Sequence, residues 1–359
     1  MFGVYFLLKR FLKPVFSVVV IFASTSALCE TKISGFASMV AGIASHGDQF
    51  LADYPNTGLY DDAISFAPDT SFGVQLKTRS SDKLEFIIQL ISHGAHEFQN
   101  DIDWAYINYN IDSELSLQMG RKRLPLYYYS DFYDLGFAYY WIRPPSDNYT
   151  WQITNYNGLS LVYEPEFGQW DATFNLYIGR EDDKANHLLT LLASNTPVDE
   201  SWKNIIGFVA ELSDDVFEYR FTIMSSQLHR QVGNMVLSDD VGQLFYGLSV
   251  NARIDAFTFL SELNHYERSN DNIFVNTSMF SLGYKIDKTI PHITYSNLKQ
   301  KQVTGSGDEH HYTISIGARH NLNKTTALKI QYDNTTDKGV TTPIVGNGKL
   351  LSFGVDFIF

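Results

Sequence analysis

The 359-residue chain contains one cysteine, and past residue 29 it has no apolar run near 20 residues. The single cysteine excludes an intramolecular disulfide and a CxxC metal site, and the missing run excludes a membrane-spanning helix. Basic residues are scarce, 27 Lys and Arg against 40 Asp and Glu, which gives a net charge of -13. A chain this acidic repels phosphate, so we expect no nucleic-acid partner.

Catalytic and cofactor motifs are also missing. The sequence has no GxSxG, HExxH, Walker or GxGxxG-helix pattern, so it implies no catalytic residues and no cofactor. His310 and His311 are adjacent, and neighbouring residues of a strand face opposite sides, so we predict no metal site there.

The first 29 residues have the order of a secretory signal peptide. Lys9, Arg10 and Lys13 precede the apolar run 15–23, and small residues follow it. We expect cleavage after Cys29, with cleavage after Ala27 as the alternative. The mature chain 30–359 then has 24 basic and 40 acidic residues, a net charge of -16.

The mature chain alternates apolar and polar residues with a period of two, which indicates β-strands. About sixteen such segments can be counted, most of them 10–14 residues long, whereas a tilted strand crosses a bilayer in about 9–11 residues. We place them at 32–46, 71–80, 84–94, 101–112, 115–125, 156–168, 170–181, 204–213, 216–230, 240–254, 256–270, 276–286, 289–301, 309–320, 325–338 and 349–359.

The links between these segments alternate between short and mostly longer ones. Links such as 81–83 and 113–114 are short, and 47–70, 126–155 and 182–203 are long. Short periplasmic turns and long extracellular loops are typical of an outer-membrane barrel. A soluble β-sandwich is not expected to place its short connections at one end and its long connections at the other. We therefore predict one all-β domain, a transmembrane antiparallel barrel of about 16 strands. Its first and last strands pair, and its polar alternate residues line a water-filled lumen.

Both ends of the mature chain resemble the Gram-negative porin family. The chain ends in Phe359 with Phe357 and Val355 at alternate positions, which resembles the assembly signal read by the barrel-assembly machinery. Residues 33–38, Ile-Ser-Gly-Phe-Ala-Ser, resemble the opening strand of such porins. The resemblance implies sixteen strands, a third long loop folded into the lumen, and a homotrimer in the bacterial outer membrane.

By the same resemblance, 126–155 is the candidate constriction loop. Basic residues set across a lumen from acidic ones produce a transverse field. We therefore assign the pore constriction to Arg121, Lys122, Arg123, Asp131, Asp134 and Arg143. Strict alternation points Arg121 and Arg123 outward and Lys122 inward, and a bulge at Gly120 reverses this. Since the basic residues outnumber the acids at this point, we predict weak anion preference or near-neutral selectivity despite the acidic chain.

The expected function is passive diffusion of small hydrophilic solutes, with no enzymatic activity. Two alternatives remain open: a barrel enzyme acting on phospholipid or peptide, and a closed barrel that serves adhesion. Three acidic groups lie in or beside long loops: Glu181-Asp182-Asp183, Asp61-Asp62 and Asp239-Asp240. They are either solvated charge or, through divalent cations, contacts with lipopolysaccharide and outer-membrane lipid.

Overall fold

The computed structural model describes residues 30–45, 49–269, 272–302, 308–339 and 346–359. The expected signal peptide lies outside these residues. Within them, sixteen strands form one closed antiparallel barrel. They are β1 (Glu30–Ala44), β4 (Ser71–Ser81), β5 (Leu84–His93), β6 (Asn100–Asn110), β7 (Leu115–Arg123), β8 (Asn155–Tyr163), β10 (Trp170–Asp183), β11 (Asp199–Ser213), β12 (Phe217–Val232), β13 (Met235–Ile254), β14 (Phe257–Arg268), β15 (Ile273–Tyr284), β16 (Thr289–Gln302), β17 (Glu309–Asn321), β18 (Thr326–Asp337) and β19 (Gly348–Ile358).

The small remaining elements lie between barrel strands. β2 (Phe50–Asp53) and β3 (Gly58–Tyr60) form a hairpin in the first long loop, and β9 (Glu166–Phe167) extends the turn before β10. The helical turns are η1 (Gly94–His96), η2 (Ser130–Phe132), η3 (Gly136–Ala138) and α2 (His187–Leu192). Across the described part of the chain, none of the helices has the length and apolar character needed to span a membrane.

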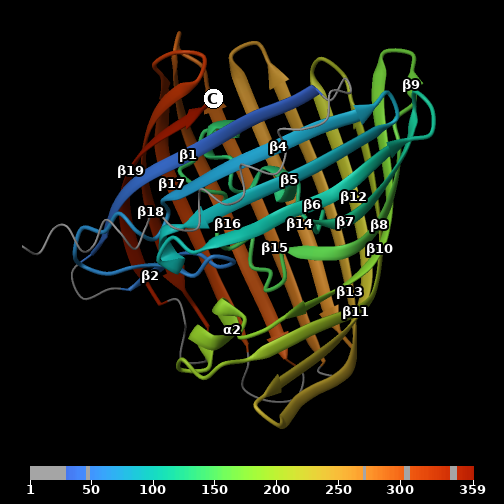
Figure 1. Ribbon diagram of the computed structural model, residues 1–359. Coiled ribbons are helices and arrows are strands. Elements are labelled where there is room, and N and C mark those ends of the chain that lie inside the picture. The colour runs from blue at the N-terminus through green and yellow to red at the C-terminus, as the bar shows by residue number, and fades with distance from the viewer. Residues whose placement is uncertain (1–29, 46–48, 270–271, 303–307, 340–345) are drawn as a thin grey trace, which may run out of the picture.

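The barrel closes where β1 lies beside β19, as the sequence predicts (Figure 1). Phe36 to Ala44 pair with Ile358 to Leu350, and the other edge of β1 pairs with β4. The Gly35 and Phe359 backbones exchange two hydrogen bonds of 2.9 Å. Closure pairs the backbone groups of both edge strands, which a bilayer requires because it offers no water to replace them.

Alternation sets the two faces of the wall. On β16, Ile293 and Tyr295 point outward and are 50% and 41% exposed, whereas His292, Thr294 and Ser296 are buried. An outward apolar band facing lipid is the general pattern of outer-membrane barrels. The sequence prediction of strand number and facing is therefore confirmed.

The lumen differs from the expectation of an all-polar lining. Inward side chains of β11 to β15 include Val209, Met224, Phe245, Leu260 and Met279, all buried. They pack against aromatic residues of loop 126–155 in one hydrophobic cluster. The expectation failed on this side because the loop, rather than water, covers these residues.

Candidate functional site: loop 126–155 and the channel beside it

Loop 126–155 lies against the inner face of the barrel and is fixed there by hydrogen bonds. The indole Nε1 of Trp141 donates to Thr294 Oγ1 on β16 at 2.8 Å. Tyr140 donates its hydroxyl to Ser281 Oγ on β15 at 2.8 Å, and the backbone N–H of Ile142 donates to a side-chain oxygen of β18. Since inward side chains of β15, β16 and β18 bind it, the loop runs across the wall inside the lumen.

Two buried basic residues secure the same loop. Arg143 lies 2.6 Å from Asp69 in the first long loop and 2.7 Å from Asp333 on β18. Burial raises the pKa of the Asp69 carboxyl to about 6, although the Arg143 guanidinium opposes this. Lys329 pairs with Asp356 at 2.7 Å and donates to the Gly136 carbonyl at 2.6 Å. The charges of Arg143 and Lys329 are therefore used to position the loop.

Gly136 marks the closest approach of the loop to the wall. A Cβ placed on it would lie 2.4 Å from Ser38 Oγ and 2.6 Å from Asp356 Oδ1. Such distances are far below van der Waals contact, so only glycine allows the loop to lie this close to β1 and β19.

A buried carboxylate holds the returning part of the loop. Asp147 accepts hydrogen bonds from His311 Nδ1 and Ser296 Oγ, both at 2.6 Å. Burial alone would raise the pKa of the Asp147 carboxyl. The hydrogen bond and charge of His311, together with hydrogen bonds from Ser296 and Thr313, hold this pKa below its usual range. Further along, Tyr149 donates to Glu262 at 2.8 Å.

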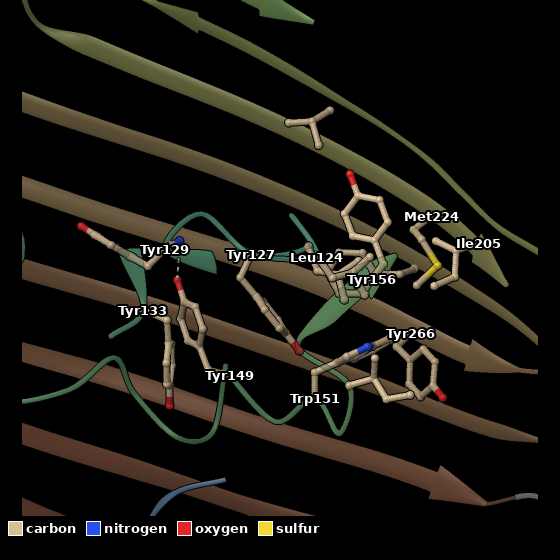
Figure 2. Close-up of a cluster of buried hydrophobic side chains, with 14 of the residues drawn as sticks. Leu124, Tyr127, Tyr129, Tyr133, Tyr149, Trp151, Tyr156, Ile205, Met224 and Tyr266 are labelled. Atoms are coloured by element: carbon tan, nitrogen blue, oxygen red, sulfur yellow. Dashed lines mark hydrogen bonds between the residues drawn. The ribbon is translucent and has the colours of Figure 1, made fainter. Parts of the chain in front are cut away.

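An aromatic cluster fills the space between the loop and β12 to β14. Figure 2 shows Trp151 of the loop beside Tyr266 of the wall, with Tyr127 and Tyr149 farther along the same cluster. The ring centroids of Trp151 and Tyr266 are 4.4 Å apart, and those of Tyr127 and Tyr149 are 4.7 Å apart. This side of the barrel is a packed core.

Two cavities remain on the opposite side, between the loop and the wall of β4 to β7. The cavity at the long-loop end is called the upper cavity here, although this end points down in Figure 1. It has a volume of about 510 Å³ and is lined mainly by polar residues such as Asn100, Asp101 and Glu181. The lower cavity, at the short-turn end, has a volume of about 360 Å³ and reaches Gln75, Gln89, Trp104 and Phe359. Both cavities are lined by Asp103 and Arg123.

The residues between the two cavities form a charged cluster of Arg123, Asp103, Asp134 and His93. Arg123 Nη1 lies 3.3 Å from Asp103 Oδ1, and its Nη2 contacts Asp134 Oδ2. His93 Nε2 lies 2.8 Å from Asp134 Oδ1. Three strand ends and the loop therefore supply one cation and two carboxylates at this point.

The other sequence-assigned residues are spread around this cluster. Arg121 binds Glu181 at 2.6 Å and is 30% exposed at the long-loop rim. Lys122 points inward, as strict alternation predicts, and contacts Gln118, while its Nζ lies 5.3 Å from the Tyr106 ring centre. Asp131 lines the lower cavity. The strand register continues past Gly120 without a shift.

Arg123 departs from strict alternation because β7 ends there. Its side chain is free to turn toward the loop, where Asp134 binds it. Arg143 lies apart from the cluster, in its own pairs with Asp69 and Asp333.

Sequence reasoning missed Asp103 and His93. Asp103 follows the outward Ile102, so period two alone indicates an inward carboxylate. His93 carried no such signal, because its role depends on Asp134, which is 41 residues away.

Three histidines line the upper cavity. The rings of His96 and His187 stack with centroids 3.7 Å apart and an interplanar angle of 14°, and His93 lies edge-on at 5.8 Å. Burial lowers the pKa of His96 to about 4, and the nearby charges of His187 and His93 add to this while Asp53 and Asp101 oppose it. Within the described residues, no group of three His, Cys, Asp or Glu side chains could hold a metal ion.

Comparisons with solved structures show the same fold in several outer-membrane proteins. The DcaP channel of Acinetobacter baumannii is similar with a TM-score of 0.65 and 10% identity, over 94% of this chain and 99% of that one. The anion-selective porin of Comamonas acidovorans gives 0.61 and 14%, over 92% and 100%. A loop-deletion mutant of OmpT, an outer-membrane protein of Vibrio cholerae, gives 0.61 and 12%, over 93% and 100%.

The sequence comparisons point the same way. No curated protein matches the chain significantly. The profile of the Gram-negative porin family, however, matches residues 17–340. With a closed sixteen-stranded barrel and this match over most of its length, the chain belongs to the Gram-negative porin family and is a channel of the bacterial outer membrane.

Proposed function

We propose that small hydrophilic solutes cross the barrel between loop 126–155 and the wall of β4 to β7, and that the Arg123 cluster is the constriction. The observation that carries this proposal is that Arg123 and Asp103 line the cavities on both sides. On the opposite side of the lumen, the aromatic cluster packs the loop against β11 to β15, so the route proposed here runs through these two cavities.

The charges along this route favour cations. Its two cavities are lined by six acidic and three basic side chains: Asp101, Asp103, Asp131, Asp134, Glu181 and Asp183 against Arg121, Arg123 and Lys184. Charges that border a passage lie within a Debye length of the passing ion, so salt screens them only in part. Because Arg143 is engaged in its own ion pairs, we propose a cation preference in place of the weak anion preference or near-neutral selectivity expected from the sequence.

Cysteine accessibility tests the route. Gln89 lines the lower cavity, and its neighbour Ile88 faces outward and is 41% exposed. In planar bilayers, a cationic methanethiosulfonate reagent should lower the single-channel current of Gln89→Cys and leave that of Ile88→Cys unchanged. Met279→Cys, behind the loop, should also be unaffected. Block at Met279→Cys without block at Gln89→Cys would place the passage on the other side of the loop.

We also propose that the barrel has no enzymatic activity and assembles as a homotrimer. The family match supports a channel rather than an enzyme. A trimer form is among the structures of Vibrio cholerae OmpT, to which this chain is similar at 11% identity. Purified protein should conduct in steps without hydrolysing phospholipid or peptide, and light scattering should give the mass of three chains. Lipid turnover without conductance would contradict the first point, and a monomer mass the second.

A further inference from the structure

We infer that a basic row on the outer face of β16 to β18 binds the phosphate groups of lipopolysaccharide directly. The row consists of Lys299 on β16, His310 on β17 and Lys338 at the end of β18, and these strands are neighbours in the wall (Figure 1). Lys299 is paired with His310 in the strand register, and the backbone N–H of Lys338 donates to the His310 carbonyl at 2.7 Å. The three residues therefore lie side by side at one level of the wall.

The row faces away from the lumen. Lys299 is exposed and lies on the same face of β16 as the outward Tyr295. The ring centres of Tyr295 and Tyr312 are 6.0 Å apart, so Tyr312 of β17 lies on this outer face as well. Tyr312 shares its face with His310, and Lys338 Nζ lies 5.0 Å from the Tyr312 ring centre.

The position of the row along the strands places it in the headgroup layer of the outer leaflet. Outward tyrosines such as Tyr295 and Tyr312 are typical of the aromatic girdle at the membrane interface. Lys299 lies four residues beyond Tyr295 toward the long-loop end, which is about 13 Å farther along β16. Long loops of such barrels are extracellular, and the extracellular leaflet of a Gram-negative outer membrane consists mainly of lipopolysaccharide. The row therefore lies at the level of its phosphate groups.

The two ammonium groups of the row are not neutralised by an acid of the described chain. Other basic side chains at the long-loop end form ion pairs: Arg180 with Asp182, Lys184 with Asp199, and His229 with Asp239. Within the described residues, Lys299 and Lys338 form no ion pair.

The segments around the row add little negative charge. Asp308 precedes β17 and is exposed, but its Oδ1 accepts the backbone N–H of Gln302 at 3.0 Å, and Lys301 at the end of β16 balances its charge. The stretches 303–307 and 340–345, which lie outside the described residues, contain no Asp or Glu. Lysine binds phosphate as a point charge, and clusters of basic residues at a membrane surface attract anionic headgroups. Direct contact of this kind needs no divalent cation, unlike a bridge through the acidic loop groups.

The experiment measures binding of fluorescent lipid A, the phosphorylated anchor of lipopolysaccharide, to the full barrel in non-ionic detergent with EDTA. Lys299→Gln combined with Lys338→Gln removes both ammonium groups and should weaken lipid A binding about thirtyfold. Lys288→Gln combined with Lys324→Gln is the matched control, because these exposed lysines lie in short turns at the other end of the same strands. Lipid A stripped of its phosphates keeps the sugars and the acyl chains, and it should bind the unmodified barrel weakly.

Binding that persists in EDTA, weakens in the row variant and is unchanged in the control supports the inference. Equal binding of the two forms of lipid A to the unmodified barrel overturns it, and this comparison needs no variant to fold. Equal weakening in both double variants overturns it too. Loss of lipid A binding in EDTA also overturns it, because the contact is then a bridge through divalent cations.

Two further measurements separate other occupants of the row. Tighter binding of phosphatidylglycerol than of lipid A would assign the row to phospholipid and overturn the inference. A changed mass of the row variant in light scattering, with unchanged lipid A binding, would assign it to a second copy of the chain. Stepwise conductance is independent of both, so a barrel that conducts without binding lipid A refutes the inference and leaves the proposed route intact.

Discussion

Replacing Arg123 with glutamine tests the proposed constriction most directly. Arg123 is the cation of a cluster that also contains Asp103 and Asp134, and both cavities meet at it. Arg123→Gln removes one positive charge and keeps a side chain that can donate to either carboxylate. The cluster changes from one cation with two carboxylates to two carboxylates alone, so the preference for cations should increase.

The size of the effect follows from Coulomb's law. An ion passing about 5 Å from the lost charge interacts with it by about 0.8 kcal/mol at the dielectric constant of water, and screening at 0.1 M salt reduces this to about 0.5 kcal/mol. Loss of the positive charge lowers the barrier for a passing cation and raises the barrier for a passing anion, each by about 0.5 kcal/mol. The difference between the two barriers therefore changes by about 1 kcal/mol. The cation-to-anion permeability ratio should therefore rise about fivefold.

The assay is the reversal potential of single channels in a tenfold KCl gradient. Arg180→Gln is the control, because it makes the same charge change at a side chain that is 62% exposed and paired with Asp182 outside the cluster. Folding is checked by the mobility of the unheated protein on a gel. An unchanged reversal potential in Arg123→Gln, or an equal shift in Arg180→Gln, would refute the assignment of the constriction to this cluster.

Further predictions concern the loop, the histidines and the chain end. Arg143→Met leaves two buried carboxylates unpaired, so unfolding in urea should show a loss of about 3–5 kcal/mol. Gly136→Val should displace the loop and raise single-channel conductance, and an unchanged conductance would contradict the tight contact. The pKa of His96 is lowered, so acid below about 6.5 should progressively weaken its stack with His187 until about pH 4. The measurement is the amide protection of residues 184–198 relative to the intrinsic exchange rate at each pH, which should fall. Deletion of Phe359 should reduce outer-membrane levels.

The barrel could be predicted because the alternation of apolar and polar residues within each strand shows which side chains face lipid and which face the lumen. In β19 the outward Leu351 and Phe353 alternate with the buried Ser352, and this pattern exists whatever the rest of the chain does. The sequence predictions of sixteen strands, of alternating links and of the β1–β19 closure all follow from such local patterns. Lys122 likewise points inward because it lies within the regular part of β7.

The position and the ion-pair partners of each charged side chain in the lumen could not be predicted in the same way. Arg123 and Arg143 look alike in sequence, yet Arg123 lies between two cavities and Arg143 is buried between Asp69 and Asp333. Those partners are 74 and 190 residues away. The partners are therefore set by how the loop folds across the lumen, which no local pattern records.

By itself, then, the sequence determined that this chain is a barrel and which residues face lipid, because a bilayer imposes one rule on every strand: apolar outside and backbone paired. Only the tertiary structure decided what lies inside. The lumen imposes no such rule, since Phe245 and Met279 are as acceptable there as Gln75 once a loop covers them. Which inward residues are covered and which border the passage depends on the path of loop 126–155, and that path is fixed by contacts such as Trp141–Thr294 and Lys329–Gly136 between distant parts of the chain.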